Sequence, residues 1–458
     1  MSECRVTLKP FMKDGYVSHV DVRLEFDTLQ RNAGSELCRV QVMTVSIPCC
    51  DPQNFCACDR QGKLAVAEEN LNSYPYEYKI YKTERNTEGP VTISYTLFPR
   101  PWKPEDTCGP YFDLKSEEGG ANASGLALLP IVDKYEGLIT LHWDLSEMPK
   151  GSYGVNTFAE GDFTKQMRLE QLQQSYFAVG QLNSITEGDF GFYWLGQPPF
   201  DVAAIAEYTQ KLFAVMAPFF RDTQSLYKIF LRRDYYPTSG GTALPRSYMF
   251  GWTEHQPVSV ESRQNILAHE MVHNWPALND NPYGITTWYS EGTAEYYSIM
   301  LPLRAGLITK ETALNEIQQR TDAYYKNPTR HLDNMAAARV CWQDRRAQKL
   351  AYGRGIFFLA NVDAQMRKAT DGKACLDDVV LKILEIDRAG GPLSNELFLN
   401  LVREMAGIDV AEQHKLMCDG VDFAPLPDSF DGHFTNIPVQ TKEADTGNDT
   451  ISYQWSLK

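Results

Sequence analysis

The hydrophobic periodicity of this chain changes once, and that change limits the possible folds more than any other feature. Up to about residue 193, apolar residues alternate with polar ones, as in HVDVRLEF (19–26). From DVAAIAEYTQ (201–210) onward, apolar residues recur every three or four positions instead. Alternation predicts β-strands, whereas the longer period predicts helices. We therefore expect an α+β multidomain protein, with a β-rich N-terminal part followed by mixed and helical parts.

The length of 458 residues exceeds what one hydrophobic core organises, so we expect several domains. Glycine, proline, asparagine and aspartate separate the alternating runs, which is typical of an antiparallel sandwich. LITLHWDL (138–145) predicts a further strand, and the small polar stretch SEEGGANASG (116–125) predicts a mobile loop. The expected parts are a β-rich N-terminal domain (1–193), a mixed domain (194–305), a helical C-terminal domain (306–435) and a tail or final edge strand (436–458).

The charge balance disfavours two classes of partner. The chain has 44 basic and 59 acidic residues and a net charge of -15, whereas nucleic acids and anionic membranes require basic surfaces. We therefore expect neither as a partner. The N-terminal stretch lacks the features of a signal peptide, and we find no run of about 18 apolar residues that would span a membrane.

The chain contains ten cysteines, several of which crowd into CCDPQNFCACD (49–59). This cluster is a possible metal site, but its spacing fits no zinc ribbon, which needs two separated CxxC pairs. We favour free thiols in a reducing compartment, and hence a cytoplasmic location.

The stretch ILAHEMVHNW (266–275) contains an HExxH motif. On a helix, His269 and His273 lie on one face and can offer ring nitrogens to a single ion, with Glu270 beside them. A catalytic zinc site needs fixed nitrogen donors, a third protein ligand and an open position for a water, whose proton a carboxylate accepts. The alternative is a pair of surface histidines that bind no metal.

A third ligand follows in TTWYSEGTAEYYS (286–298). Glu291 is a carboxylate on a second predicted helix and completes a His-His-Glu set, so we expect one Zn²⁺ per chain. Glu295 lies four residues further on the same face, where it can accept a proton from a ligand imidazole and fix its tautomer. The alternative for Glu295 is a solvated helix carboxylate.

These two motifs, HEMVHNW and WYSEGTAEYY, resemble those of the gluzincin zinc metallopeptidases. Within that group the sequence is most similar to the glycyl aminopeptidase family, relatives of alanyl aminopeptidase and leukotriene A4 hydrolase. The resemblance implies an N-terminal antiparallel β-sandwich-like domain, a thermolysin-like catalytic domain and a helical C-terminal domain. It also leads us to expect that the PDZ-like C-terminal module of the family is missing.

The resemblance extends to AYGRGIFFLA (351–360), where the family has a tyrosine that hydrogen-bonds the oxyanion of the tetrahedral intermediate. Tyr352 is the matching residue, and a phenol donor suits a charge that develops only in the transition state. The alternative is a buried core tyrosine. Arg354 replaces the family's lysine and is a candidate for substrate binding.

The family also has a Gly-Gly strand that pairs with the substrate, followed by a glutamate that binds the free amino group. The matching stretch here is SGGTALPRS (239–247), which makes Gly240, Gly241 and Thr242 candidates for substrate binding. No glutamate follows directly, so Glu254 is the candidate replacement. The alternative for this stretch is a plain flexible loop.

Together these features predict a zinc-dependent metallopeptidase, most simply an aminopeptidase acting on short peptides. In this hypothesis Glu270 activates a zinc-bound water, and zinc and Tyr352 stabilise the oxyanion. The alternatives are an endopeptidase or another amide hydrolase of the same fold, and a non-catalytic zinc-binding scaffold. The peptide substrate is the only partner that we predict.

Overall fold

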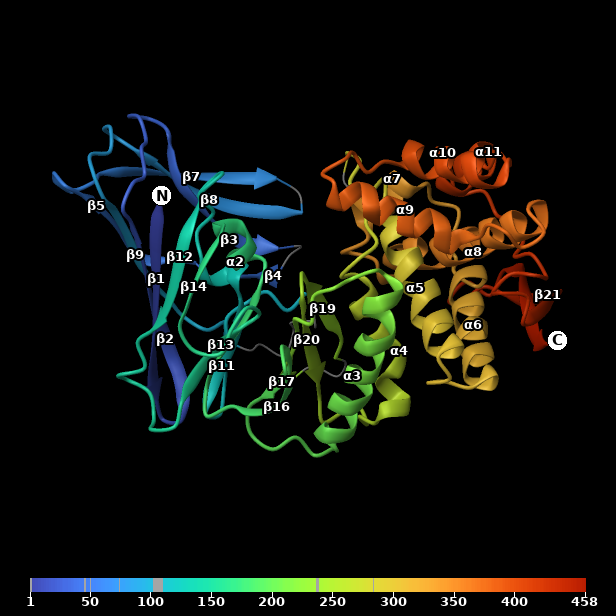
Figure 1. Ribbon diagram of the computed structural model, residues 1–458, viewed down its shortest axis with the longest axis horizontal. Helices are drawn as coiled ribbons and strands as arrows, with labels where there is room; N and C mark the ends of the chain where they lie inside the picture. Colours follow the sequence, from blue (N-terminus) through green and yellow to red (C-terminus); the bar gives the residue numbers. More distant parts are fainter. Residues whose placement is uncertain are drawn as a thin grey trace. The chain divides into compact units, whose positions relative to one another are not determined.

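The chain forms two compact units in a computed structural model that describes residues 2–44, 47–49, 51–73, 75–101, 110–235, 239–282 and 284–458. Unit 1 consists of residues 1–207 and 225–262, and unit 2 of residues 208–224 and 263–458. Figure 1 gives the element labels used below. None of the helices within the described ranges combines the length and apolar character needed to cross a bilayer.

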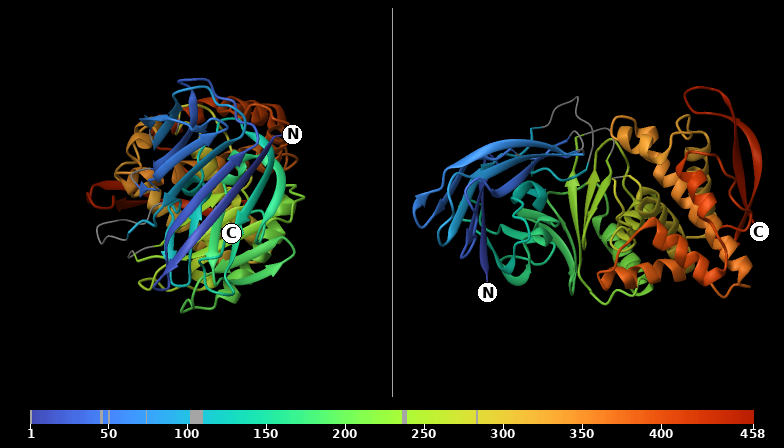
Figure 2. Two further views of the ribbon diagram at one scale, coloured as in Figure 1. Left: turned by 90° about the vertical axis from the view of Figure 1, so that its left-hand side faces the viewer. Right: turned by 90° about the horizontal axis from the view of Figure 1, so that it is seen from above.

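The N-terminal part of unit 1 is built from β-sheets that are antiparallel except where β1 pairs with β12 in parallel (Figure 2). Its largest sheet has the order β14-β12-β1-β2-β9-β5-β6. The predicted alternation is confirmed in β2, where Val20, Val22, Leu24 and Phe26 are buried. The strands of this sheet are β14 (Phe163–Arg168), β12 (Glu136–Trp143), β1 (Glu3–Lys13), β2 (Tyr16–Phe26), β9 (Val91–Leu97), β5 (Gln53–Asp59) and β6 (Gly62–Lys63).

Two smaller sheets complete the β-rich part, and α1 (Gly125–Leu128) and α2 (Leu169–Gln173) lie between their strands in the sequence. One has the order β4-β3-β8-β7 and the other β10-β11-β15-β13. Their strands are β4 (Ile47–Pro48), β3 (Glu36–Thr44), β8 (Tyr76–Thr83), β7 (Val66–Ser73), β10 (Lys115–Glu117), β11 (Gly120–Ser124), β15 (Tyr176–Gly180) and β13 (Tyr153–Asn156).

The prediction of a mobile loop at 116–125 is wrong, because β10 and β11 form a hairpin there. All of β11 is buried, and it pairs with β15. A Cβ atom at Gly120 would lie 2.1 Å from the carbonyl oxygen of Val179. The small residues of this stretch therefore permit close packing, whereas we interpreted them as a sign of mobility.

Unit 1 also contains a mixed sheet, in the order β16-β17-β18-β20-β19. Its inner strands β17, β18 and β20 are parallel, and β19 is an antiparallel edge strand. Helix α3 (Val202–Phe219) connects β17 to β18, and Asp201 caps it by accepting from the backbone N–H of Ala204 at 3.0 Å. The strands are β16 (Asn183–Glu187), β17 (Phe190–Trp194), β18 (Tyr227–Arg233), β20 (Ser247–Trp252) and β19 (Gly241–Leu244).

Unit 2 is mostly helical, as the period of its apolar residues predicted. In α9, the whole predicted stripe is buried (Leu376, Val379, Val380, Ile383 and Leu384). The helices are α4 (Val260–Val272), which begins in unit 1, α5 (Thr287–Arg304), α6 (Lys310–Tyr325), α7 (Asn334–Val340), α8 (Arg345–Ala369), α9 (Leu376–Arg388), α10 (Asn395–Ala406) and α11 (Ala411–Cys418).

The segment 436–458, expected as a tail or final edge, belongs to a hairpin of β21 (Phe434–Lys442) and β22 (Asp449–Leu457). Trp455 is buried, and its indole N–H donates to the Thr321 hydroxyl on α6 at 2.8 Å. The domain limits expected at residues 193, 305 and 435 stay a prediction. The sheet that contains β19 also includes β16, which precedes residue 194, and β17, which ends at that residue.

The described cysteines are free thiols: Cys4, Cys38, Cys49, Cys56, Cys58, Cys341, Cys375 and Cys418. The sulfur atoms of Cys56 and Cys58 lie 3.9 Å apart on β5. Cys50 and Cys108 lie outside the described residues.

Helices α5 and α8 approach each other backbone to backbone. A Cβ atom at Gly355 would lie 2.0 Å from the Trp288 carbonyl oxygen, and one at Gly292 would lie 2.4 Å from the Gly355 Cα. Only glycine permits this distance. The crossing matters for function because Glu291 lies beside Gly292 and Tyr352 lies one turn before Gly355.

We expect Gly355→Ala to destabilise unit 2 by about 1–3 kcal/mol, since the added methyl group forces the two helices apart. Replacing glycine by alanine inside a helix ordinarily stabilises it by about 1 kcal/mol. A net loss of stability would therefore come from the steric clash between the two helices. Chemical denaturation measures the difference. Gly240→Ala is the control, because its Cβ would meet no atom within 4 Å. Unchanged stability in Gly355→Ala would show that the helices have room to separate.

Candidate metal centre

Helix α4 presents the two histidines of the HExxH motif to the same point. His269 lies in its last turn, and His273 follows directly after the helix ends. The Nε2 atoms of the two rings are 3.1 Å apart. His269 is buried, whereas His273 is partly exposed.

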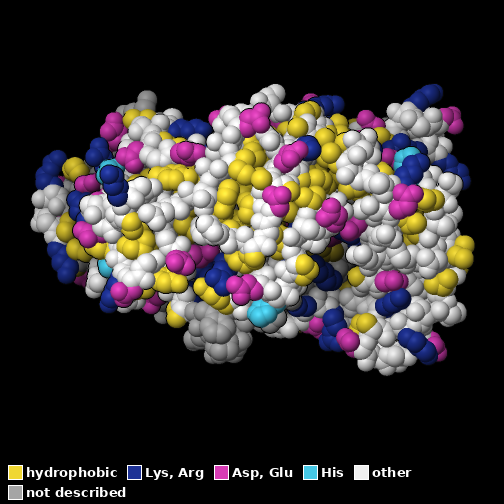
Figure 3. Space-filling view, turned by 90° about the horizontal axis from the view of Figure 1, so that it is seen from below, with side chains coloured by type: hydrophobic (Ala, Val, Ile, Leu, Met, Phe, Trp, Pro, Cys, Tyr) yellow, Lys and Arg dark blue, Asp and Glu magenta, His cyan; other side chains and the backbone are white. Residues whose placement is uncertain are grey.

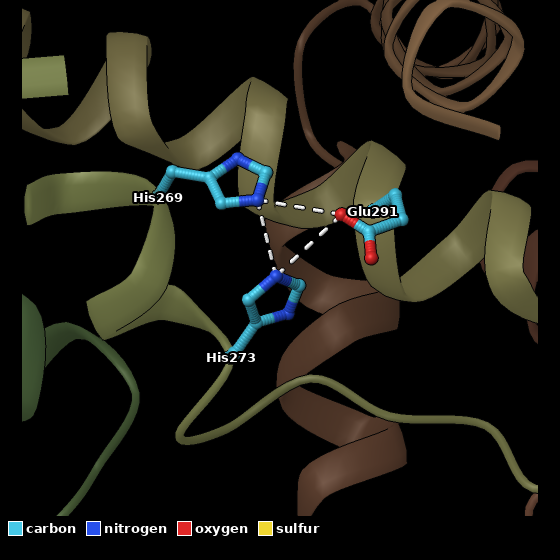
Figure 4. Close-up of side chains that lie close together, drawn as sticks. All are labelled: His269, His273 and Glu291. Carbon is cyan, nitrogen blue, oxygen red and sulfur yellow. Dashed lines mark hydrogen bonds and ion pairs between the residues drawn. The ribbon is translucent and has the colours of Figure 1, made fainter. Parts of the chain in front are cut away.

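Glu291, near the start of α5, supplies the third group (Figure 4). Its Oε2 atom lies 3.3 Å from His269 Nε2 and 3.6 Å from His273 Nε2. The three residues form a cluster that can hold a metal ion. The structure therefore brings together the three ligands that the sequence predicted.

The geometry of this cluster fits zinc. Ligand distances of about 2.0–2.1 Å around a tetrahedral ion place neighbouring donor atoms about 3.4 Å apart, close to the three separations observed. The Oε2 atom of Glu291 is buried and faces both imidazole nitrogens. A buried carboxylate oxygen in this position is well suited to bind a cation.

Glu295 lies one turn after Glu291 on α5 and contacts the far side of the first histidine. Its Oε1 atom is 3.2 Å from His269 Nδ1. Glu295 is 8% exposed, which excludes the alternative of a solvated carboxylate. A proton held at Nδ1 by this carboxylate directs the lone pair of Nε2 toward the cluster.

The acids also set the charges of the cluster. Without a bound metal, burial lowers the pKa of His269, but hydrogen bonds to Glu291 and Glu295 outweigh it and raise the pKa to about 10. A metal ion that binds at Nε2 would displace the proton from that atom. Burial raises the pKa of Glu295, but the charge of Arg320 and the contact with His269 outweigh it and lower the pKa to about 2. The pKa of Glu291 is likewise lowered by both histidines against the effect of burial. Both carboxylates are therefore ionised at neutral pH.

Tyr352 on α8 lies against the cluster. Its ring stacks on that of His269, with centroids 5.5 Å apart and planes inclined by 3°. Lys349 Nζ lies 4.1 Å from the centroid of the tyrosine ring. Burial raises the pKa of Tyr352, and the charges of Glu291 and Glu270 raise it further. The phenol therefore keeps its proton and can donate a hydrogen bond at neutral pH.

The remaining candidates lie elsewhere. Arg354 is fully buried and donates to Asn334 Oδ1 at 2.7 Å and to the carbonyl oxygens of Arg330 (2.6 Å) and Leu332. These are contacts within the fold, and they lend no support to a role in substrate binding. Glu254 belongs to unit 1 and pairs with Arg233 at 2.6 Å.

The Gly-Gly stretch forms the edge strand β19 and its approach, so the alternative of a plain flexible loop is excluded. Tyr111 holds it by accepting from the Gly240 N–H at 3.0 Å and by donating its own N–H to the Thr242 hydroxyl at 3.1 Å. Tyr176 donates its hydroxyl to the Thr242 carbonyl oxygen at 3.1 Å. These contacts lie within unit 1.

The sequence analysis missed Arg320, which contacts Glu295 through its Nε atom. It lies one turn after Glu316 on α6, an i,i+4 pair of the kind found on many solvated helices. No feature of the local sequence distinguishes it from such a pair.

Comparison with known proteins agrees with this site. The model of the M61 glycyl aminopeptidase family matches residues 262–353, which contain the cluster and Tyr352. In this region the chain is similar to the gluzincin-type metallopeptidases. The match covers the two motifs, and most of the chain lies outside it. No curated protein sequence gives a significant match to the chain.

Solved structures show that the chain also shares its fold with known proteins. An aminopeptidase N family protein from Idiomarina loihiensis aligns with a TM-score of 0.72 at 15% identity, over 98% of this chain and 81% of the other. An M1 zinc metallopeptidase from Deinococcus radiodurans gives 0.57 at 16% identity, over 93% and 95%. Yeast leukotriene A4 hydrolase gives 0.53 at 16% identity, over 92% and 66%. At this identity the likeness is one of fold.

Proposed function

We propose that the protein is a zinc-dependent aminopeptidase that binds one Zn²⁺ per chain and acts on short peptides. The observation that carries this proposal is the convergence of His269 Nε2, His273 Nε2 and Glu291 Oε2 at separations of 3.1–3.6 Å. Three protein ligands leave the fourth position of a tetrahedral ion open, which is the arrangement of catalytic rather than structural zinc sites.

The residues around the cluster supply the parts needed for peptide hydrolysis. Zinc, when bound, acts as a Lewis acid and lowers the pKa of a water molecule. Glu270 accepts the proton of the attacking water and passes it to the nitrogen of the leaving amine. Tyr352 donates its hydroxyl proton in a hydrogen bond to the carbonyl oxygen as that oxygen gains negative charge.

Strand β19 is the proposed binding edge for the substrate backbone. The Gly251 N–H donates to the Gly240 carbonyl oxygen across the hairpin, so this carbonyl group points toward β20. Antiparallel pairs alternate, so Gly241 and Ala243 direct their backbone groups to the open side of the sheet. An extended peptide can pair with these groups. A mutant of the Deinococcus enzyme binds a Tyr-Ser-Ala substrate, a peptide of the proposed size.

The described free thiols support a reducing compartment, and we propose the cytoplasm. We do not propose nucleic acids or membranes as partners. On the face in Figure 3, basic and acidic side chains are interspersed.

The aminopeptidase activity is tested with matched peptides that carry either a free or an acetylated N-terminus. We expect zinc near one ion per chain, and chelator-sensitive cleavage that releases single residues from free peptides and spares the acetylated ones. Cleavage of acetylated peptides in preference to free ones would establish an endopeptidase or another amide hydrolase. Bound zinc without cleavage of any peptide would favour the non-catalytic scaffold.

A further inference from the structure

A single arginine on α6 connects three elements beside the metal cluster. Arg320 contacts Glu295 on α5 through Nε and donates from Nη2 to Asn265 Oδ1 on α4 at 2.5 Å. Its Nη1 donates to the Glu316 carboxylate at 2.6 Å and to the Glu316 carbonyl oxygen at 3.0 Å. All three nitrogen atoms of the guanidinium therefore have partners, and the side chain is only 14% exposed.

These contacts continue to the first metal ligand. Arg320 holds the Oε2 atom of Glu295, and the Oε1 atom of the same carboxylate lies 3.2 Å from His269 Nδ1. With both oxygens occupied, the carboxylate has one orientation. The chain of contacts runs from Arg320 through Glu295 to His269, and its last member directs a lone pair into the cluster.

The charge of the arginine is needed as well as its shape. Glu291 and Glu295 both lie against the ring of His269, so two anions share a small buried volume. The positive charge of Arg320 compensates the negative charge of Glu295, the carboxylate that does not bind metal. A planar guanidinium also fixes direction, which an ammonium group does not. Asn265 donates to the Ser298 hydroxyl at 3.3 Å, so the acceptor of Nη2 is held in turn by α5.

We propose that Arg320 is a positioning residue of the zinc site. It holds Glu295 in the orientation that keeps the proton on His269 Nδ1 and leaves His269 Nε2 free to bind the ion. The inference rests on the proposed function only in requiring that the cluster binds zinc, and it does not require that any peptide is cleaved.

The test is a double-mutant cycle read as zinc affinity, measured by competition with a chelator. We expect Arg320→Gln and Glu295→Gln each to weaken zinc binding by about 10–100-fold, the usual cost of losing a residue that orients a ligand. The double variant should bind zinc as weakly as either single variant, because Arg320 acts through Glu295. Arg320→Lys keeps the positive charge but loses the planar guanidinium. Its zinc affinity should therefore lie between those of Arg320→Gln and the wild type.

The matched control is Arg330→Gln, because Arg330 is also buried and pairs with two acids, Asp422 and Glu443. It should lower the free energy of unfolding without changing zinc affinity. Unchanged zinc affinity in Arg320→Gln, or additive effects in the double variant, would overturn the inference. Should Arg320→Gln fail to fold, the zinc affinity of Arg320→Lys, alone and combined with Glu295→Gln, decides instead. A wild-type protein that binds zinc but cleaves nothing would contradict the proposed function and leave this inference intact.

Discussion

Glu270→Gln is expected to keep its zinc and to lose activity by at least about 100-fold in kcat, the scale of a removed acid–base catalyst. Glutamine has the size of glutamate but cannot accept the proton of the attacking water. The metal ligands are untouched, so zinc content and the midpoint of thermal unfolding should stay at wild-type values. Steady-state kinetics on a peptide that the wild type cleaves gives the rate, and metal analysis gives the occupancy.

Glu261→Gln is the control for this experiment, because Glu261 is an exposed carboxylate in the first turn of the same helix. It should leave kcat and zinc content unchanged. Full activity in Glu270→Gln would refute the role assigned to Glu270. Loss of zinc together with activity would show instead that Glu270 supports the metal site.

Tyr352→Phe should lower kcat by about 10²–10³-fold, as the loss of one oxyanion donor does in other hydrolases. KM should change little, because the hydrogen bond gains its strength only as charge develops on the carbonyl oxygen. Phenylalanine retains the ring that stacks on His269, so zinc affinity should also stay constant. A loss confined to kcat distinguishes a catalytic phenol from a packing residue.

Tyr289→Phe is the matched control for the tyrosine. Tyr289 is fully buried on α5, and within the described residues its hydroxyl has no hydrogen-bond partner. Removing that hydroxyl should leave kcat near the wild-type value. An equal loss in both variants, or a fall in zinc affinity with Tyr352→Phe, would contradict the proposed role.

Local patterns predicted the features that depend on local geometry. The alternation in β2 and the helical spacing in α9 each report which face of one element is buried, so the fold class followed from them. His269 and His273 are four residues apart at the end of a predicted helix, so their convergence could also be predicted. Glu291 was predicted as the third ligand because a carboxylate on a second helix commonly completes a His-His-Glu zinc site. Its position beside the histidines depends on the packing of α5, which sequence spacing does not give.

Features created by tertiary packing could not be predicted. Arg354 resembles a substrate-binding residue in sequence but binds backbone carbonyl oxygens inside the fold. Arg320 resembles an ordinary surface ion pair, yet it contacts a residue behind the metal cluster. The stretch 116–125 has the composition of a loop but is paired on both sides as a strand. In each case at least one partner is far away in the sequence.

The contact between Gly292 and Gly355 has a consequence for engineering this enzyme. Side chains usually separate two helices, and their size can then be altered to tune the gap. Here main chain touches main chain, so the separation of α5 and α8 at this crossing is already at its lower limit. Larger residues elsewhere can only widen it. A graft of this centre onto another scaffold therefore has to transfer α5 and α8 as one piece, together with the segment of α4 that carries the histidines.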